Sequence, residues 1–452
     1  MKAINPATGE IVGSYAAHSR SEVEAILEAA GEAYTSWCRV DISARSESLR
    51  RVGALLRETK IEFAELMTRE MGKPIVEAEA EIEKSAWVCD FYADNAAGFL
   101  APQEVETDAS KSYVRFDPIG PILAVMPWNF PFWQVLRFAA PALTAGNVCL
   151  LKHASNVPGC ALAIEELFKN AGLPDGAFTT LLVGADAVAD LIANPRVAAV
   201  TLTGSAAAGR AVAAQAGKHL KKTVLELGGS DPFIVFADAD LQSAAEAATL
   251  ARTINSGQSC IAAKRFIVES TVAAEFAAML AEHMEALRVG DPMSRDTQVG
   301  PLAREDLVDE IDDQVQRSIA AGAHVLTGGL RLERQGFFYA PTVLGDVEPG
   351  MAVFEEETFG PVAAVIRARD SVHALELANR SHLGLGASLW TSNRAFGAEM
   401  AGQVEAGVVF VNGIVKSDPR LPFGGVKQSG YGRELSEFGI REFVNIKTVW
   451  IA

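Results

Sequence analysis

The 452-residue sequence has little cysteine and a shortage of positive charge. Its five cysteines are odd in number and form no CxxC pair, which argues against a disulfide scaffold and a zinc ribbon. We therefore expect no bound metal. Lysine and arginine number 40 against 57 acidic residues, so the formal net charge is −17. Because an acidic chain is repelled by phosphate backbones and anionic lipids, we expect neither nucleic acid nor a membrane surface as its partner.

The sequence also lacks an apolar leader and an uninterrupted hydrophobic run. The first ten residues, MKAINPATGE, have no apolar region typical of a signal peptide. From Pro118 to Leu151 the only charged residue is Arg137, but five prolines interrupt this stretch. A bilayer helix would tolerate these prolines badly. We expect the stretch to form buried core of a soluble, cytoplasmic protein.

What is present is an ordinary globular composition. The length suggests about three domains at ~150 residues each. The first hundred residues show helical periodicity, and Ser21 with Glu24 forms a capping-box pattern. From about residue 120, short apolar runs alternate with helical stretches. The predicted strands are 148–151, 178–183, 197–202 and 224–227, with helices at about 185–193 and 206–217. This alternation predicts a doubly wound parallel sheet that binds ligands at the carboxyl ends of its strands.

A second alternating series runs from Phe233 to about Asn412 and predicts a second α/β domain. Its expected strands are 233–236, 265–268, 362–366, 386–390 and 407–411. We place the join between the two domains at Gly228 and Gly229, where a tight backbone turn costs little.

Two predicted strand ends carry residues suited to a nucleotide, although the GxGxxG fingerprint is absent. Thr203-Gly204-Ser205 precedes a helix whose N-terminal N–H groups could bind a pyrophosphate; the alternative is that Ser205 only caps the helix. Lys152 ends another strand and could bind ribose hydroxyls, unless it is simply a solvated lysine. Ser155 is uncharged where an acidic residue would repel a 2′-phosphate, so both NAD and NADP remain open.

Three residues have the chemistry of a catalytic centre. Cys260 follows the small, polar sequence Asn255-Ser256-Gly257-Gln258-Ser259, which permits close approach of a ligand; the alternative is a buried structural thiol. Glu226 ends an apolar strand, where burial would raise its pKa into the range of a general base, unless it is paired. Asn129, between two prolines, could donate to an oxyanion or merely form a turn.

Arg137 is isolated in the apolar stretch and needs a partner, because burying an unpaired charge is costly. That partner is either a carboxylate of the protein or a carboxylate of the substrate.

Eight segments in order resemble the aldehyde dehydrogenase superfamily over essentially the whole chain. They are INPATGE (4–10), PWNFP (127–131), KHAS (152–155), TGSAAAG (203–209), LELGG (225–229), GQSC (257–260), EETFGPV (356–362) and PFGGVKQSGYGRE (422–434). The resemblance implies a Rossmann-type coenzyme domain, an α/β catalytic domain and a small β oligomerisation element. The implied boundaries are 1–104 with 119–228, then 229–432, then 105–118 with 433–452. The element would make the protein a homodimer or homotetramer.

The resemblance also implies roles for the residues. Cys260 would attack the aldehyde, Asn129 and the Cys260 N–H would hold the oxyanion, and Glu226 would activate the water that hydrolyses the thioester. The implied coenzyme residues, for NAD or NADP, are Trp128, Lys152, Ser155, Gly204, Ser205, Leu227, Glu357 and Phe359.

Within the superfamily, PWNFPFWQVLR, KHASN, LELGGSDPF and KSDPRLPFGGVKQSG are similar to short bacterial succinate-semialdehyde dehydrogenases. This similarity implies that Arg137 and Ser417 bind the substrate carboxylate and that Trp133, Ser259 and Phe423 line the aldehyde tunnel. Two departures are Ile254, where some relatives have a second arginine, and Ala262, which removes the cysteine pair used by others as a redox switch.

Two alternative functions stay open from the sequence. Glutarate semialdehyde is the rival substrate within the family. A different class, a cysteine hydrolase, could use Cys260, Glu226 and Lys152 as a catalytic set, and its turnover would not depend on a coenzyme.

Overall fold

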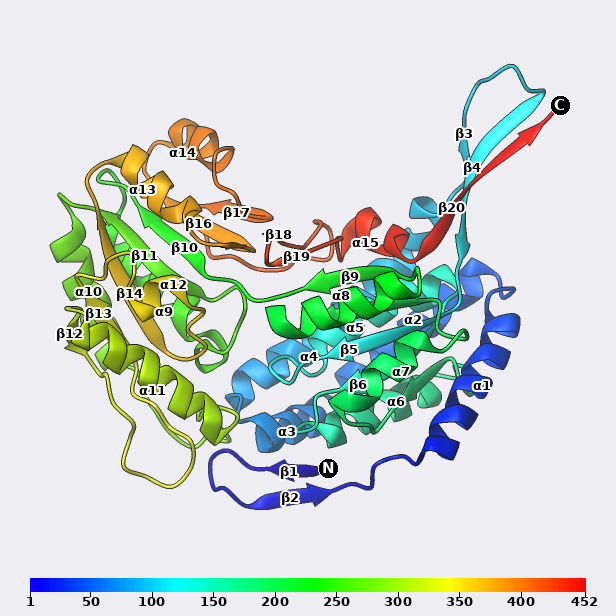
Figure 1. Ribbon diagram of the computed structural model, residues 1–452, viewed down its shortest axis with the longest axis horizontal. Helices are drawn as coiled ribbons and strands as arrows, with labels where there is room; N and C mark the ends of the chain where they lie inside the picture. The colour runs from blue at the N-terminus through cyan, green and yellow to red at the C-terminus, as the bar shows by residue number, and fades with distance from the viewer.

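Two sheets with helices packed around them form the two lobes of the chain in the computed structural model, which describes residues 1–452 (Figure 1). The six-stranded sheet has the order β19-β9-β8-β5-β6-β7, and all its pairs are parallel except β19 with β9. Its strands are β5 (Pro121–Met126), β6 (Val148–His153), β7 (Phe178–Thr180), β8 (Ala199–Thr203), β9 (Lys222–Glu226) and β19 (Gly430–Tyr431). The four strands predicted from apolar runs in this region are all present.

The helices of this lobe fall into two groups. Those between the strands are α5 (Trp133–Ala145), α6 (Pro158–Asn170), α7 (Val188–Ala193) and α8 (Ala206–Lys218). Those before the strands are α1 (Arg20–Trp37), α2 (Ile42–Glu58), α3 (Lys60–Met71) and α4 (Ile75–Phe99), preceded by the hairpin β1 (Lys2–Ile4) and β2 (Ile11–Ser14). The capping box at the start of α1 is formed by Ser19 and Glu22, so the predicted pair Ser21 and Glu24 was wrong by two residues.

The second lobe is built on a seven-stranded sheet of order β12-β13-β14-β11-β10-β16-β17, parallel apart from the edge strand β12. Its strands are β10 (Asp231–Val235), β11 (Ala263–Glu269), β12 (His324–Thr327), β13 (Thr342–Gly345), β14 (Val362–Ala368), β16 (Gly386–Trp390) and β17 (Val408–Val411). Its helices are α9 (Leu241–Thr253), α10 (Ala273–Glu285), α11 (Glu305–Ala320), α12 (Ala352–Glu355), α13 (Ser371–Asn379) and α14 (Arg394–Ala401). Strand β15 (Leu383–Gly384), which precedes β16, pairs with β18 (Val426–Lys427), and the chain then returns to the first lobe through β19.

Gly228 and Gly229 join β9 to β10, but not through the tight turn expected from the sequence. Neither glycine has a positive φ. What requires glycine is space, because a Cβ on Gly229 would lie 2.5 Å from the carbonyl oxygen of Cys260. The backbone that joins the two lobes therefore packs closely against the backbone of Cys260.

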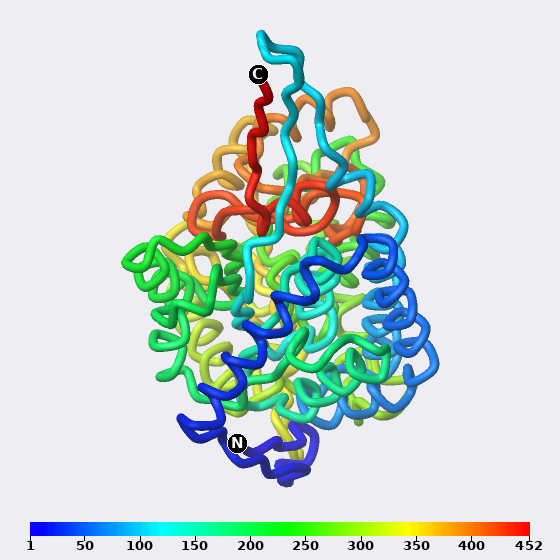
Figure 2. The backbone as a smooth tube through the Cα atoms, turned by 90° about the vertical axis from the view of Figure 1, so that its right-hand side faces the viewer, coloured from blue at the N-terminus to red at the C-terminus, as the bar shows by residue number.

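A β arm projects from the body of the protein (Figures 1 and 2). Strand β4 (Lys111–Pro118) pairs on one side with β3 (Gln103–Glu104) and on the other with the C-terminal β20 (Val444–Ile451), which follows α15 (Ser436–Glu442). Ile446, Trp450 and Ile451 remain exposed on β20.

The apolar stretch 118–151 forms the end of β4, β5, α5 and β6, and every residue of α5 is buried. No helix in the structure has both the length and the apolar character needed to cross a bilayer.

Candidate active site

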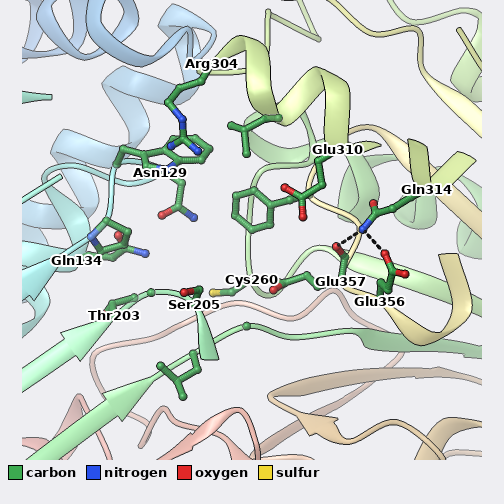
Figure 3. A pocket seen from close by; sticks show the side chains of 17 residues that line it. Asn129, Gln134, Thr203, Ser205, Cys260, Arg304, Glu310, Gln314, Glu356 and Glu357 are labelled. Carbon is green, nitrogen blue, oxygen red and sulfur yellow. Dashed lines mark hydrogen bonds between the residues drawn. The ribbon is translucent and has the colours of Figure 1, made fainter. Parts of the chain in front are cut away.

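Cys260 lies where two cavities meet at the interface of the lobes. The first cavity, shown in Figure 3, has a volume of about 450 Å³ and the second about 280 Å³. Both are lined by Cys260 and by Gln134. The thiol is thus reachable from two sides, which is the arrangement that a reaction between two bound molecules requires.

The first cavity gathers six of the eight predicted coenzyme residues. They are Trp128, Gly204, Ser205, Leu227, Glu357 and Phe359, with Asn129 beside them. The ring of Trp128 meets that of Phe359 edge-on at 5.8 Å between centroids. Glycine again provides room, since a Cβ on Gly209 would lie 2.6 Å from the side chain of Leu227.

The N-terminus of α8 opens on this first cavity. Ser205 caps the helix, its Oγ accepting the N–H of Ala208 at 3.3 Å, so the capping role considered from the sequence is real. Capping uses one of the four N–H groups that a helix start leaves without helical partners, and the others can bind an anion. The first cavity therefore suits a dinucleotide, with its pyrophosphate at this helix.

Lys152 and Ser155 lie outside the lining of either cavity. Lys152 is the last residue but one of β6 and pairs with Val125 of β5. It therefore lies near the carboxyl edge of the sheet, where Trp128 and Asn129 follow β5. Burial lowers the pKa of its ammonium, and Asp186 opposes that effect. Ser155 is exposed on the loop after β6. Neither cavity that contains Cys260 includes Lys152 or Glu226, so neither cavity brings the Cys-Glu-Lys set of the hydrolase alternative together.

A strained turn positions Cys260. Asn255 and Ser256 have φ values of 53° and 55°, in the left-handed region that costs non-glycine residues roughly 1–2 kcal/mol each. Two contacts hold this turn: Glu77 accepts the Asn255 N–H at 2.6 Å, and Ser256 Oγ accepts the N–H of Gly300 at 2.9 Å. Strain maintained by buried contacts is typical of functional sites.

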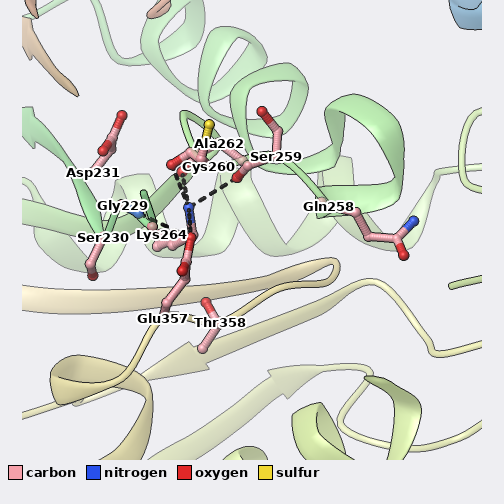
Figure 4. Close-up of polar contacts among 12 residues, drawn as sticks. Gly229, Ser230, Asp231, Gln258, Ser259, Cys260, Ala262, Lys264, Glu357 and Thr358 are labelled. Atoms are coloured by element: carbon pink, nitrogen blue, oxygen red, sulfur yellow. Dashed lines mark hydrogen bonds and ion pairs between the residues drawn. The ribbon is translucent and has the colours of Figure 1, made fainter. Parts of the chain in front are cut away.

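Lys264 secures the other side of the cysteine (Figure 4). Its buried ammonium donates to the carbonyl oxygens of Ser259, Cys260 and Ala262 at 3.0, 2.9 and 3.1 Å. It also forms an ion pair of 3.7 Å with Glu357, whose carboxylate accepts the N–H of Gly229. One lysine thus connects the nucleophile loop to the wall of the first cavity.

The pKa of the Cys260 thiol is raised to about 12, first by burial; Arg137 and Lys264 lower it, whereas Glu357 and Glu226 raise it. The thiol is therefore protonated at neutral pH and must lose its proton when it reacts. Its backbone N–H makes no hydrogen bond. The side chain of Asn129 is buried beside it and donates to the Gln258 carbonyl at 3.0 Å. These two groups lie where an oxyanion formed at the cysteine could be held.

Glu226 is buried at the end of β9, and one of its carboxylate oxygens has no hydrogen-bond partner. Burial, with Glu434 second, raises the pKa of Glu226 to about 8, while Arg137 and Arg433 oppose the shift. A carboxyl group with this pKa exchanges protons near neutral pH.

The second cavity contains all five predicted substrate residues. They are Trp133, Arg137, Ser259, Ser417 and Phe423. Arg137 is buried and paired with Glu434, so its partner within the protein is a carboxylate. Its guanidinium also lies 5.0 Å from the centre of the Phe423 ring. Because Glu434 already balances its positive charge, Arg137 attracts a substrate carboxylate less strongly than an unpaired arginine would.

Several site residues were missed from the sequence. They are Glu77, Lys84, Gln134, Lys264 and Glu434. Glu77 and Lys84 belong to α4, whose helical pattern resembled ordinary core packing. Lys264 carried one signal, because it and Arg265 are adjacent charges at the start of an apolar strand.

Comparisons with known proteins point the same way as the geometry. The model of the Aldehyde dehydrogenase family matches residues 1–449. A probable NADP(+) succinate-semialdehyde dehydrogenase from Synechocystis is 54% identical over 449 residues, 99% of each chain. The NAD(P)+ succinate semialdehyde dehydrogenase Sad from Escherichia coli is 48% identical over 447 residues, which are 99% of this chain and 97% of that one.

Solved structures give the same result. The succinic semialdehyde dehydrogenase of Streptococcus pyogenes, in complex with NADP+, has a TM-score of 0.98 at 38% identity, covering 100% of this chain and 99% of that one. The succinate-semialdehyde dehydrogenase of Burkholderia pseudomallei has a TM-score of 0.97 at 36% identity, covering 100% and 94%. The α/β fold class predicted from the sequence is confirmed.

Proposed function

The chain belongs to the aldehyde dehydrogenase family, and from that premise we propose that it oxidises succinate semialdehyde to succinate with NADP+ or NAD+ as the hydride acceptor. The observation that carries the proposal is the position of Cys260 between two cavities. The first cavity would hold the coenzyme and the second the aldehyde, with Cys260 in the lining of both.

The reaction has two stages. Sγ of Cys260 loses its proton to solvent and bonds to the aldehyde carbon. The resulting oxyanion accepts hydrogen bonds from Asn129 Nδ2 and from the Cys260 N–H. NAD+ or NADP+, held by the residues of the first cavity, would supply the hydride acceptor that converts the adduct on Cys260 to a thioester. Water then adds to the thioester on Cys260, the carbon–sulfur bond breaks, and succinate leaves with the thiol restored.

Glu226 is the general base for the water. A carboxylate whose pKa lies near 8 accepts a proton more readily than an ordinary glutamate, whose pKa is about 4.3. Its unpartnered oxygen leaves one lone pair free to receive that proton.

Both coenzymes fit the residues of the first cavity and its edge. Glu357 would bind the nicotinamide ribose, Lys152 the adenosine ribose, and the start of α8 the pyrophosphate. Ser155 is exposed and uncharged, so it leaves room for the 2′-phosphate of NADP. The names of similar proteins include both NADP(+) and NAD(P)+ enzymes, which supports this assignment.

Succinate semialdehyde is preferred as substrate because similar proteins carry that name and because the second cavity has positive charge around an apolar interior. Arg137 and Ser417 line this cavity, with Trp133, Ser259 and Phe423 around the aldehyde chain. Glutarate semialdehyde remains the rival substrate.

We assign the β arm to self-association, as a homodimer or homotetramer. The exposed apolar residues of β20, Ile446, Trp450 and Ile451, lie on an arm that extends from the body (Figure 2), and an apolar edge strand of this kind needs a cover. The boundaries 1–104 with 119–228, 229–432, and 105–118 with 433–452 remain our division of the chain. A cytoplasmic location suits a chain whose five cysteines are all free, the proposed nucleophile Cys260 among them.

The experiment is a steady-state panel of aldehydes run in parallel with NAD+ and NADP+. The proposal predicts coenzyme-dependent oxidation with the highest kcat/KM for succinate semialdehyde. A higher kcat/KM for glutarate semialdehyde would change the substrate, and coenzyme-independent ester hydrolysis alone would overturn the assignment.

A further inference from the structure

Two lysines that line the second cavity, Lys84 and Lys416, form no ion pair; Lys84 is half-buried and Lys416 is exposed. Helix α4 presents Glu77, Ala80, Glu81 and Lys84 to this cavity, a spacing that places all four on one face of the helix. Lys84 is the residue of interest, because Glu77 and Glu81 on the same face already bind other groups.

The two glutamates are engaged elsewhere. Glu77 accepts the backbone N–H of Asn255 at 2.6 Å. Glu81 accepts the N–H groups of Phe132 and Trp133 at 2.9 and 3.0 Å and forms an ion pair with Lys73. Neither carboxylate forms an ion pair with Lys84.

Arg137, the residue expected to bind the substrate carboxylate, is neutralised by Glu434. Lys84 has no carboxylate within ion-pair distance. Its ammonium donates to Ser417 Oγ at 2.8 Å and lies 4.3 Å from the centre of the Trp133 ring. An ammonium has three donors, so the bond to Ser417 leaves donors free for a ligand.

We infer that Lys84, together with the Ser417 hydroxyl that it holds, is the group that binds the carboxylate of the aldehyde substrate and sets the preference for an anionic chain. This inference rests on the proposed oxidation of a semialdehyde acid in the same cavity. Lys84 supplies the charge, and Ser417, whose oxygen accepts from Lys84, turns its own O–H to the carboxylate. Arg137 lines the same cavity and keeps Glu434 as its partner.

The surroundings of Lys84 agree with this role. Burial lowers the pKa of Lys84 to about 8, and Arg137 and Lys416 lower it further, while Glu81 and Asp418 oppose them. A bound carboxylate would stabilise the protonated ammonium and so raise the pKa of Lys84 again. The KM for an anionic aldehyde should accordingly rise as the pH passes through about 8, where unliganded Lys84 loses its proton.

The test compares Lys84→Met with wild type on succinate semialdehyde and on butanal, a neutral aldehyde of equal carbon number. Loss of a charge-assisted hydrogen bond predicts a fall in kcat/KM of roughly 10- to 100-fold for succinate semialdehyde, carried by KM, with little change for butanal. Lys84→Arg should recover part of the loss and remove the rise of KM above about pH 8. The matched control, Lys169→Met on the exposed face of α6, should leave both substrates unchanged.

A second measurement does not depend on the anionic substrate turning over. Succinate should inhibit butanal oxidation by wild type, and Lys84→Met should lose that inhibition. Equal loss on both aldehydes, or unchanged inhibition by succinate, would overturn the role of Lys84. If wild type itself did not prefer succinate semialdehyde to butanal, the proposed function would fail instead, and the two failures are therefore distinguishable. Should Lys84→Met not fold, Lys84→Gln and the pH dependence of KM in wild type carry the same test.

Discussion

Replacing Glu226 by glutamine should remove the pH dependence of turnover. The pKa of Glu226 is raised to about 8, mainly by burial and then by Glu434. A general base works only when ionised, so activity should increase as pH rises through that value. With a pKa of about 8, about 1 in 11 molecules carries the ionised base at about pH 7, and about 10 in 11 do at about pH 9. Where hydrolysis of the thioester limits turnover, kcat should therefore rise about tenfold between these two pH values.

The assay follows formation of reduced coenzyme at saturating substrate across about pH 6 to 9.5. In Glu226→Gln, kcat should be low and flat with pH. Because glutamine affects only the hydrolytic step, one equivalent of reduced coenzyme per active site should still form in the first turnover. The matched control is Glu246→Gln, an exposed glutamate on α9 that should keep the wild-type profile. A wild-type kcat that does not change across this range, or a Glu226→Gln profile parallel to wild type, would refute the role of Glu226 as the base.

Three further predictions concern other parts of the site. Asn129→Ala should lower kcat by about 10²- to 10³-fold, because it removes a side-chain donor to the oxyanion, and an unchanged kcat would exclude that role. Ser155→Glu should lower kcat/KM for NADP+ at least about tenfold while NAD+ is retained, because a carboxylate repels the 2′-phosphate; equal effects on both coenzymes would contradict the position given to Ser155. Arg137→Gln should lower the free energy of unfolding by about 3–5 kcal/mol in a urea titration, because it leaves Glu434 buried without its cation, and adding Glu434→Gln should restore most of that loss. No recovery in the double variant would show that the pair is not the cause.

Local signals predicted most of the fold. Runs of apolar residues bounded by polar ones located four of the six strands of the first sheet and five of the seven of the second, because buried parallel strands are apolar on both faces. Strands β5, β19, β12 and β13 were not predicted. The start of the first helix was less predictable. Its capping box is formed by Ser19 and Glu22, but Ser21 also has a glutamate three residues later, so the sequence offers two equivalent pairs.

The site was harder to predict where it depends on contacts between distant segments. The motif around Cys260 and the strand end at Glu226 carried their own chemical signals. By contrast, the partner of Arg137 is Glu434, which a single sequence cannot pair with it. Lys84 could not be distinguished from a surface lysine on an amphipathic helix until α4 was packed against the second cavity.

The central claim is that Cys260 forms a thioester with the aldehyde only when coenzyme is present. The most direct test is intact-protein mass spectrometry of Glu226→Gln mixed with succinate semialdehyde, with and without NADP+, followed by peptide mapping. The account predicts one succinyl group, on the peptide that contains Cys260, only in the sample with coenzyme. Equal labelling without coenzyme, or a succinyl group on another residue, would contradict it.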